Sequence, residues 1–469
     1  MVNKNVSTLF IFLLLPFAAI RASERPQKSL SLSECISIAL QNASSVSKAE
    51  NARHLTGVEL LKSYGSFLPK VSSSASWTPT SVNRSYSVTS PLYGGTSTSA
   101  YKTRTETATV SLGVTASLNL FNGLSDYAAL QSALDRKKAS GFSLQRAKET
   151  VAYDVTQSYY QVLLDRELLG IARENLKSAD DLLTLTERQF NIGLKSITDL
   201  YQQQADTSNS KLEVIKAENK LRRSKLELLR RLRLDPETEL TLKPVDTAAI
   251  AKLSPDIDLN ALKTTALARR ADLEAEALQT TAARWDVKNT AGARLPKLDF
   301  TFTISSDAID SYSLLLQGVR YDYPYPSVGK QLENGVDYGL SLNLSWTIFD
   351  GFQTRYAVQS AKIAQLNKQL DYEDLKDNIQ IDLRQVAGDY RTAFDQIGSA
   401  RASLKAAKSA YAGILRKYEL GASGFVELSA SKTALFNARS SVTQALYNLA
   451  LQKALLDFTA GTMNVDQND

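Results

Sequence analysis

An internal repeat constrains this sequence more than any other feature, because two copies of one unit are expected to fold alike. Laid on itself with an offset of 228 residues, the sequence shows ordered identities without a gap from Phe121 to Leu228. Upstream the offset is 227, and Leu68-Pro69-Lys70 recurs as Leu295-Pro296-Lys297. We therefore expect two structural repeats, at residues 23–237 and 258–469, joined by a linker at residues 238–257.

The first segment has the order of a secretory signal peptide. Lys4 precedes an apolar stretch at residues 9–20, and the small residues Ala22 and Ser23 follow it. A helix that crosses a bilayer needs about 20 apolar residues, so this stretch is too short to be one. We expect residues 1–22 to be a cleaved signal peptide and the rest of the chain to be exported.

Alternating residues predict strands in both repeats. From Val110 to Leu120 every second residue is apolar, with Ser, Gly, Thr or Asn between them, which is the period of a strand. The second repeat shows the same alternation twice. The expected strands are residues 70–80, 107–120, 298–306 and 337–349, each with approximate ends.

The two faces of these strands favour a membrane barrel over a soluble sandwich. Their polar face carries small hydroxyls, which suit a wet lumen, and their apolar face suits lipid. Known membrane barrels begin at about eight strands, so four cannot close one. An open sheet edge in lipid would also leave backbone groups without hydrogen bonds. Three copies would supply about twelve strands, so we expect a homotrimer in contact with membrane lipid.

A very long helical pattern follows each strand pair. Turn signals at Phe121-Asn122-Gly123 and Phe349-Asp350-Gly351 precede stretches without Pro that reach Pro236 and the last residue. The stretch 124–192 would be about 100 Å long as a helix, longer than any compact domain holds. Its seven-residue repeat predicts a left-handed coiled coil. Apolar or aromatic residues on this repeat include Leu134, Val155, Val162, Leu169, Leu176, Leu183 and Phe190, then Leu383, Tyr390, Ile397, Leu404, Tyr411 and Tyr418.

Each long helix is expected to turn back at a short segment that contains glycine. Gly193 and Gly421 predict left-handed caps at the helix C-termini. Ser196 and Ser423 are predicted to cap the helices that return.

Two carboxylates lie at equivalent positions in the first turns of the returning helices, namely Asp199 and Glu427. Complementarity to the helix dipole is sufficient to explain a carboxylate there. In a three-fold assembly the same residues would also form two rings of three at one end of the molecule.

Composition argues against enzyme and metal chemistry. With one Cys and one His, the chain has no internal disulfide, no Cys/His zinc site and no nucleophilic triad that needs a second His. The net charge of +6 is small for 469 residues, and the arginines at 222–233 are interpreted as a solvated helix face. We expect no catalytic residue, no cofactor, no metal and no nucleic acid partner.

Together these features resemble the TolC family of trimeric outer-membrane efflux channels. The resemblance is carried by the duplication, the Leu-Pro-Lys and Phe-x-Gly segments that flank the strands, and the tips F-N-x-G-x(4)-T-D-L and Y-x-x-G-x(5)-E-L. It implies a mainly α fold in which long α-helical hairpins form a periplasmic α-barrel. Four strands per chain would contribute to a 12-strand β-barrel. It also implies the outer-membrane channel of a tripartite efflux or type I secretion system, with a periplasmic adaptor and an inner-membrane transporter as partners.

The resemblance also implies the site. It places a periplasmic gate at Asp199, Tyr418, Ser423 and Glu427. It places adaptor docking at Gly193, Leu194, Ser196, Gly421, Ala422 and Ser423. Ser423 stands where members of the family can have Arg, and Ala430 where a second acidic ring can occur. The links that close the gate must therefore differ here, with Lys195 available as a substitute cation.

One alternative from another class stays open, an exported coiled-coil scaffold without a pore. That alternative predicts no alternating strands and a native protein that can be extracted without detergent. Three kinds of cargo also stay open for the channel: small toxic compounds, proteins and metal ions.

Overall fold

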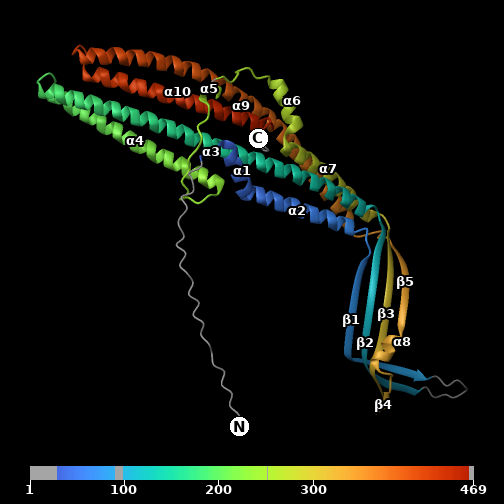
Figure 1. Ribbon diagram of the computed structural model, residues 1–469. Helices are drawn as coiled ribbons and strands as arrows, with labels where there is room; N and C mark the ends of the chain where they lie inside the picture. Colours follow the sequence, from blue (N-terminus) through green and yellow to red (C-terminus); the bar gives the residue numbers. More distant parts are fainter. Residues whose placement is uncertain (1–28, 90–98, 251, 464–469) are drawn as a thin grey trace, which may run out of the picture.

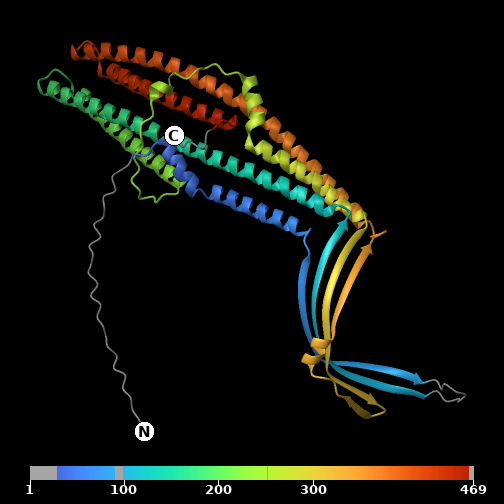
Figure 2. The same ribbon diagram turned by 45° about the vertical axis from the view of Figure 1, so that its right-hand side comes forward.

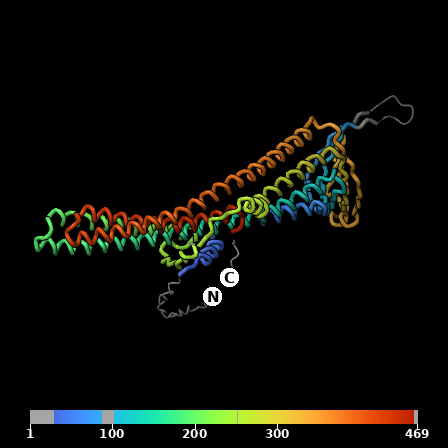
Figure 3. The backbone as a smooth tube through the Cα atoms, turned by 90° about the horizontal axis from the view of Figure 1, so that it is seen from above, coloured from blue at the N-terminus to red at the C-terminus, as the bar shows by residue number. Residues whose placement is uncertain are grey.

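The computed structural model describes residues 29–89, 99–250 and 252–463 (Figure 1). The predicted signal peptide, residues 1–22, lies outside the described residues. The chain forms a curved wall of long helices with a narrow antiparallel sheet at one end (Figures 1 and 2). The free ends of two helical hairpins lie at the other end (Figure 3).

The two halves of the chain contain the same main elements in the same order. The first half contains α1 (Leu32–Asn42), α2 (Ser44–Gly65), β1 (Lys70–Thr89), β2 (Ser99–Asn122), α3 (Ser125–Asn191) and α4 (Ile197–Leu232). The second contains α6 (Leu259–Arg269), α7 (Ala271–Ala291), β3 (Lys297–Leu316), β5 (Val336–Ser345), α9 (Gln353–Glu419) and α10 (Phe425–Thr459). Four short elements have no counterpart: α5 (Thr247–Ile250), η1 (Gly292–Arg294), β4 (Val319–Tyr323) and α8 (Val328–Asn334).

The strands lie in the order β1-β2-β3-β5, and β4 pairs with the far end of β3. Residues paired across neighbouring strands share a face of the sheet. One face therefore carries Val71, Ala116, Phe302 and Leu340, and the other carries Ser72, Thr115, Thr303 and Gly339. Leu340 on the apolar face is 72% exposed in the single chain. The scaffold alternative predicted no such strands, so the sheet argues against it.

The strand ends differ from those predicted. β1 runs to Thr89 and β3 to Leu316, well beyond the predicted ends near 80 and 306, because the strand pairs continue past bulges at 78–81 and 108–109. β5 ends at Ser345, short of the predicted 349. Its ladder with β3 stops where β3 begins, at Lys297 opposite Ser345, so residues 346–349 have no partner strand in the single chain.

Four helices continue the sheet into the wall, in the order α2, α3, α7 and α9 (Figure 1). α3 and α9 are each unbroken over 67 residues, and each begins after a residue with left-handed backbone, Leu124 (φ 64°) and Phe352 (φ 68°). In the described part of the chain, no helix combines the length and the hydropathy needed to cross a membrane.

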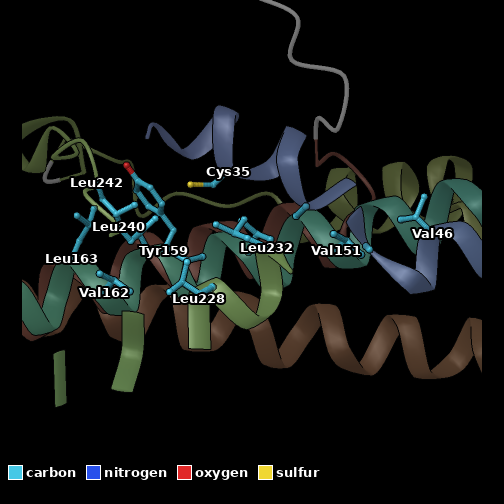
Figure 4. Close-up of a cluster of buried hydrophobic side chains, with 14 of the residues drawn as sticks. Cys35, Val46, Val151, Tyr159, Val162, Leu163, Leu228, Leu232, Leu240 and Leu242 are labelled. Carbon is cyan, nitrogen blue, oxygen red and sulfur yellow. The ribbon is translucent and has the colours of Figure 1, made fainter. Parts of the chain in front are cut away.

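The largest apolar core lies midway along the wall, where α1, α3, α4 and the following linker meet (Figure 4). Cys35, Leu163, Leu228 and Leu232 are fully buried there. The hydroxyl of Tyr159 donates to the carbonyl of Lys243 over 2.7 Å and so ties the linker to α3. This core fixes where the first long hairpin leaves the wall.

Candidate functional site at the helix tips

Both long helices end in the same glycine turn. Gly193 has φ 80°, its N–H donates to the carbonyl of Phe190 over 2.8 Å, and that of the next residue, Leu194, donates to Gln189 over 2.8 Å. Gly421 (φ 75°) and the residue after it make the same pair of bonds at 3.1 and 2.8 Å. This is the Schellman arrangement, in which a left-handed residue satisfies the last carbonyls of a helix. Glycine adopts that backbone without a steric penalty, so both turns follow from the sequence.

The two returning helices begin differently. Ser196 caps α4 in a capping box: its Oγ accepts from the N–H of Asp199 over 3.1 Å, and its own N–H donates to Asp199 Oδ2 over 3.2 Å. The prediction that Ser423 caps α10 is wrong. Gly424, which has no side chain, occupies the position equivalent to Ser196, so α10 has no side-chain cap. Ser423 Oγ instead donates to Glu427 Oε2 over 2.6 Å.

Asp199 and Glu427 are both third residues of their helices, where a carboxylate complements the helix dipole. Asp199 bonds within its own turn, whereas Glu427 is exposed and has Ser423 as its partner. Ser423 itself is only 9% exposed. The tips therefore present two carboxylates held by neighbouring hydroxyls.

Tyr418 lies inside the junction between the two hairpins rather than on its surface. It is 1% exposed and packs with Leu182 of α3 and Leu428 of α10. Its hydroxyl is 3.5 Å from Thr186 Oγ1 on α3. Lys195, from the turn of the first hairpin, holds its Nζ 3.8 Å from the centroid of the Tyr418 ring, within the range of a cation–π interaction. Three residues of the other hairpin thus contact Tyr418.

An ion pair joins the returning helices close to the tips. Lys432 of α10, only 3% exposed, places its Nζ 3.0 Å from Asp206 Oδ2 of α4, whose side chain is 23% exposed. No motif in the sequence indicates this pair. The available signal was the helical spacing: Lys432 follows Leu428 by four residues and precedes Leu435 by three, so it belongs to their buried face.

The predicted docking residues lie on the outer surface of the two turns, apart from Ser423. Gly193, Leu194, Ser196, Gly421 and Ala422 are exposed. Large apolar side chains beside them are exposed as well, namely Ile192, Leu420 and Val426. An exposed apolar group of this kind is typical of a surface that binds another protein.

Comparison with known proteins gives a consistent result. The outer membrane efflux protein family matches residues 35–232 and 262–462. Outer membrane protein TolC of Escherichia coli (strain K12) is 24% identical over 360 residues, which cover 74% of this chain and 69% of TolC. Pyoverdine export outer membrane protein OpmQ of Pseudomonas aeruginosa is 27% identical over 222 residues, 46% of this chain and 44% of OpmQ.

Among solved structures, the crystal structure of CusC has a TM-score of 0.76 and 17% identity, with 92% of each chain covered. That similarity concerns the fold. The family match covers most of the chain, and each of its two stretches holds one complete helical hairpin. The chain therefore belongs to the outer membrane efflux protein family.

Proposed function

We propose that three copies of this chain close into one conduit that runs through the outer membrane and the periplasm. The family is one of outer-membrane efflux channels and is not a class of enzymes. The observation that carries the proposal is that the sheet of one chain has two open edges. β1 and β5 are the outer strands of the sheet, and each has a neighbour on one side only. Three copies would close about twelve long strands into a barrel, which leaves no open edge in lipid.

In this assembly the helix tips form the periplasmic entrance, and its gate consists of Asp199, Tyr418, Ser423 and Glu427. The contacts that support a closed gate run between the hairpins of one chain: Lys195 with Tyr418, and Lys432 with Asp206. Rings of three Asp199 and three Glu427 carboxylates would attract cations into the entrance. The conduit is passive and needs no cofactor.

The exposed tip residues Gly193, Leu194, Ser196, Gly421 and Ala422 dock a periplasmic adaptor, and the buried Ser423 supports the second turn from within. The adaptor connects the conduit to an inner-membrane transporter. Of the relatives compared above, only OpmQ carries a cargo, pyoverdine, in its name. For this chain we assign the choice of cargo to the transporter and general conduction to the channel.

Single-channel conductance of the purified protein in a planar bilayer tests the proposal. Glu427→Ala removes three carboxylates from the entrance, so block by multivalent cations should weaken. Glu373→Ala, which changes an exposed carboxylate far along α9 from the tip, is the matched control and should leave the block unchanged. Unchanged block in Glu427→Ala would contradict the gate, and a wild-type protein that forms no channels would contradict the conduit.

A further inference from the structure

Inside one chain, α7 meets the start of α3 through two glycines. A Cβ added to Gly123 would lie 2.3 Å from the carbonyl oxygen of Gly292. A Cβ added to Gly292 would lie 2.1 Å from Ser125 Oγ and 2.8 Å from the carbonyl oxygen of Gly123. Distances this short are below van der Waals contact, so glycine is required at both positions.

A second contact stabilises the same interface. Asp286 of α7 accepts from Ser132 Oγ of α3 over 2.7 Å and from Arg136 Nη2 over 2.6 Å. Together, the two glycines and the Asp286 carboxylate join one repeat to the other within the chain.

The repeat duplicates both halves of this interface, but in one chain the duplicates do not meet. At offsets of 227 and 228, the counterparts of Gly292 and Gly123 are Gly65 and Gly351, and those of Asp286 and Ser132 are Glu59 and Ser360. These four counterparts keep glycine, carboxylate or hydroxyl, whereas the counterpart of Arg136 is Ala364, so the second hydrogen bond to the carboxylate is not duplicated. Yet a Cβ on Gly65 or Gly351 would meet nothing within 4 Å, and Glu59 and Ser360 are exposed.

The sheet also contains residues that have no strand to pair with in one chain. Residues 118–122 of β2 pair only with β3, because β1 begins at Lys70 opposite Ser117. Their counterparts, residues 346–350 after β5, have no strand beside them in the single chain. The partner that the repeat assigns to them is the strand equivalent to β3, namely β1. That β1 must come from another molecule, because β1 and β5 lie on opposite sides of the sheet (Figure 1).

We infer that α2 of one copy packs on α9 of the next copy as α7 packs on α3 within each chain. Gly65 lies against Gly351 of the neighbouring copy, and Glu59 accepts a hydrogen bond from its Ser360. The occupant of this surface is a second copy of the chain, so the inference rests on the proposed trimer. Exposed apolar side chains on the two helices become buried in this contact between α2 and α9, which we call the seam, among them Val58 of α2 and Tyr356 and Ile363 of α9.

Replacement of one glycine tests the seam. Gly65→Ala adds a Cβ that meets nothing in one chain, so the protomer should fold. In the trimer the same Cβ would clash with the neighbouring copy at the seam. The half-life of the trimer in detergent should fall about tenfold, as expected when one methyl group overpacks an interface. Gly57→Ala is the matched control: it lies on the same helix, also with nothing within 4 Å. Its counterpart in the repeat is the exposed Arg284, so this position faces away from the seam.

Cross-linking supplies a second measurement that does not depend on trimer stability. Glu59→Cys combined with Ser360→Cys should give covalent dimers and trimers with a short thiol cross-linker. Glu59→Cys combined with Lys362→Cys should not, because position 362 lies about 200° around α9 from position 360.

The outcomes separate this inference from the proposed function. A wild-type protein that is monomeric in lipid would contradict the trimer and therefore both proposals. A trimeric wild type whose Gly65→Ala and Gly57→Ala variants dissociate equally, or whose two cysteine pairs cross-link equally, would overturn the seam alone.

Discussion

Lys195 and Tyr418 belong to different hairpins. Their contact therefore stabilises the closed state, in which the tips lie together, and is lost when the tips separate. A cation–π contact of this kind contributes about 0.5–2 kcal/mol, depending on how dry it is. Because the long helices are otherwise joined at the tips by few polar contacts, a loss of this size shifts the balance between closed and open tips.

Lys195→Ala should therefore raise the fraction of time that the channel is open, measured as single-channel current at constant voltage. Lys211→Ala removes an exposed lysine further along α4 and serves as the control. Tyr418→Phe keeps the ring and should retain most of the closed state. Equal open fractions for Lys195→Ala and Lys211→Ala would contradict the contribution of this contact.

The pair of Lys432 with Asp206 should behave as a buried ion pair. Asp206→Ala leaves the Lys432 ammonium buried without its carboxylate, which costs about 3–5 kcal/mol. Hydrogen exchange in the tip halves of α4 and α10 should become faster in this variant. The double variant Asp206→Leu with Lys432→Met should recover most of the protection, since two apolar side chains replace the two charges. A double variant as unprotected as the single one would contradict this account.

The residue-level chemistry was predictable where it depends on local sequence. Gly193 and Gly421 predicted the turns, and the turns fix Asp199 and Glu427 as third residues of their helices. The burial of Tyr418 and the pairing of Lys432 depend on helices that are more than 200 residues apart in the chain. Such contacts follow from how the hairpins pack, which no local pattern specifies.

At the scale of elements, the two arginines beside Asp272 hold the end of α10 in the wall. Arg270 binds Asp272 through two nitrogens at 3.0 and 2.6 Å, and Arg146 of α3 lies 3.3 Å from the same carboxylate. The same arginines donate to the carbonyls of Phe458 and Thr459 at 3.3 and 3.2 Å. Cations are favourable at a helix C-terminus. By binding both arginines, Asp272 positions two cations at the C-terminus of α10.

This cluster predicts a pH dependence. Burial alone would raise the pKa of Asp272, but the hydrogen bond from Arg270 and the charges of Arg146 and Arg270 outweigh burial, so its pKa lies below the usual value. A lowered pKa gives stability that is complete above the unfolded pKa of about 4 and lost as the pH falls through the folded pKa. Exchange at the end of α10, corrected for intrinsic rates, should be constant from pH 8 to 5 and accelerate only below about pH 4. Asp272→Asn should lack this transition.

Element type followed from periodicity, while element ends did not. The seven-residue spacing correctly marks Val155, Val162 and Leu169 as buried, but nearer the tip burial moves to Ala179, Leu182 and Thr186. There α3 has different neighbours: Leu182 and Thr186 contact Tyr418 of the second hairpin, and the carbonyl of Ala179 accepts from Gln203 of α4. Likewise, β4 and the outer half of β1 depend on pairing partners rather than on their own alternation.

At the scale of the whole molecule, the apolar face of the sheet is expected to contact lipid. The three tryptophans allow a direct test. Trp77 pairs with Val110 on the apolar face, and Trp346 continues the alternation beyond Leu344. Trp285 lies in the helical wall, 5.9 Å from Tyr127 between ring centroids.

In vesicles that contain brominated lipid, variants that keep only Trp77 or only Trp346 should be strongly quenched. A variant that keeps only Trp285 should not, and it provides the control for quenching without lipid contact. Equal quenching of all three tryptophans would contradict the assignment of the sheet to the membrane.

The unbroken course of α3 and α9 has a mechanical consequence. Only Gly123 and Leu124 separate β2 from α3, so the helix is joined almost rigidly to the sheet. A rod of about 100 Å works as a lever: one degree of tilt at its base moves the far end by about 1.7 Å. A tilt of about 5° would displace a tip by roughly 9 Å, beyond the reach of any of the tip contacts. A barrel that barely changes shape can therefore accompany a wide change of aperture at the opposite end.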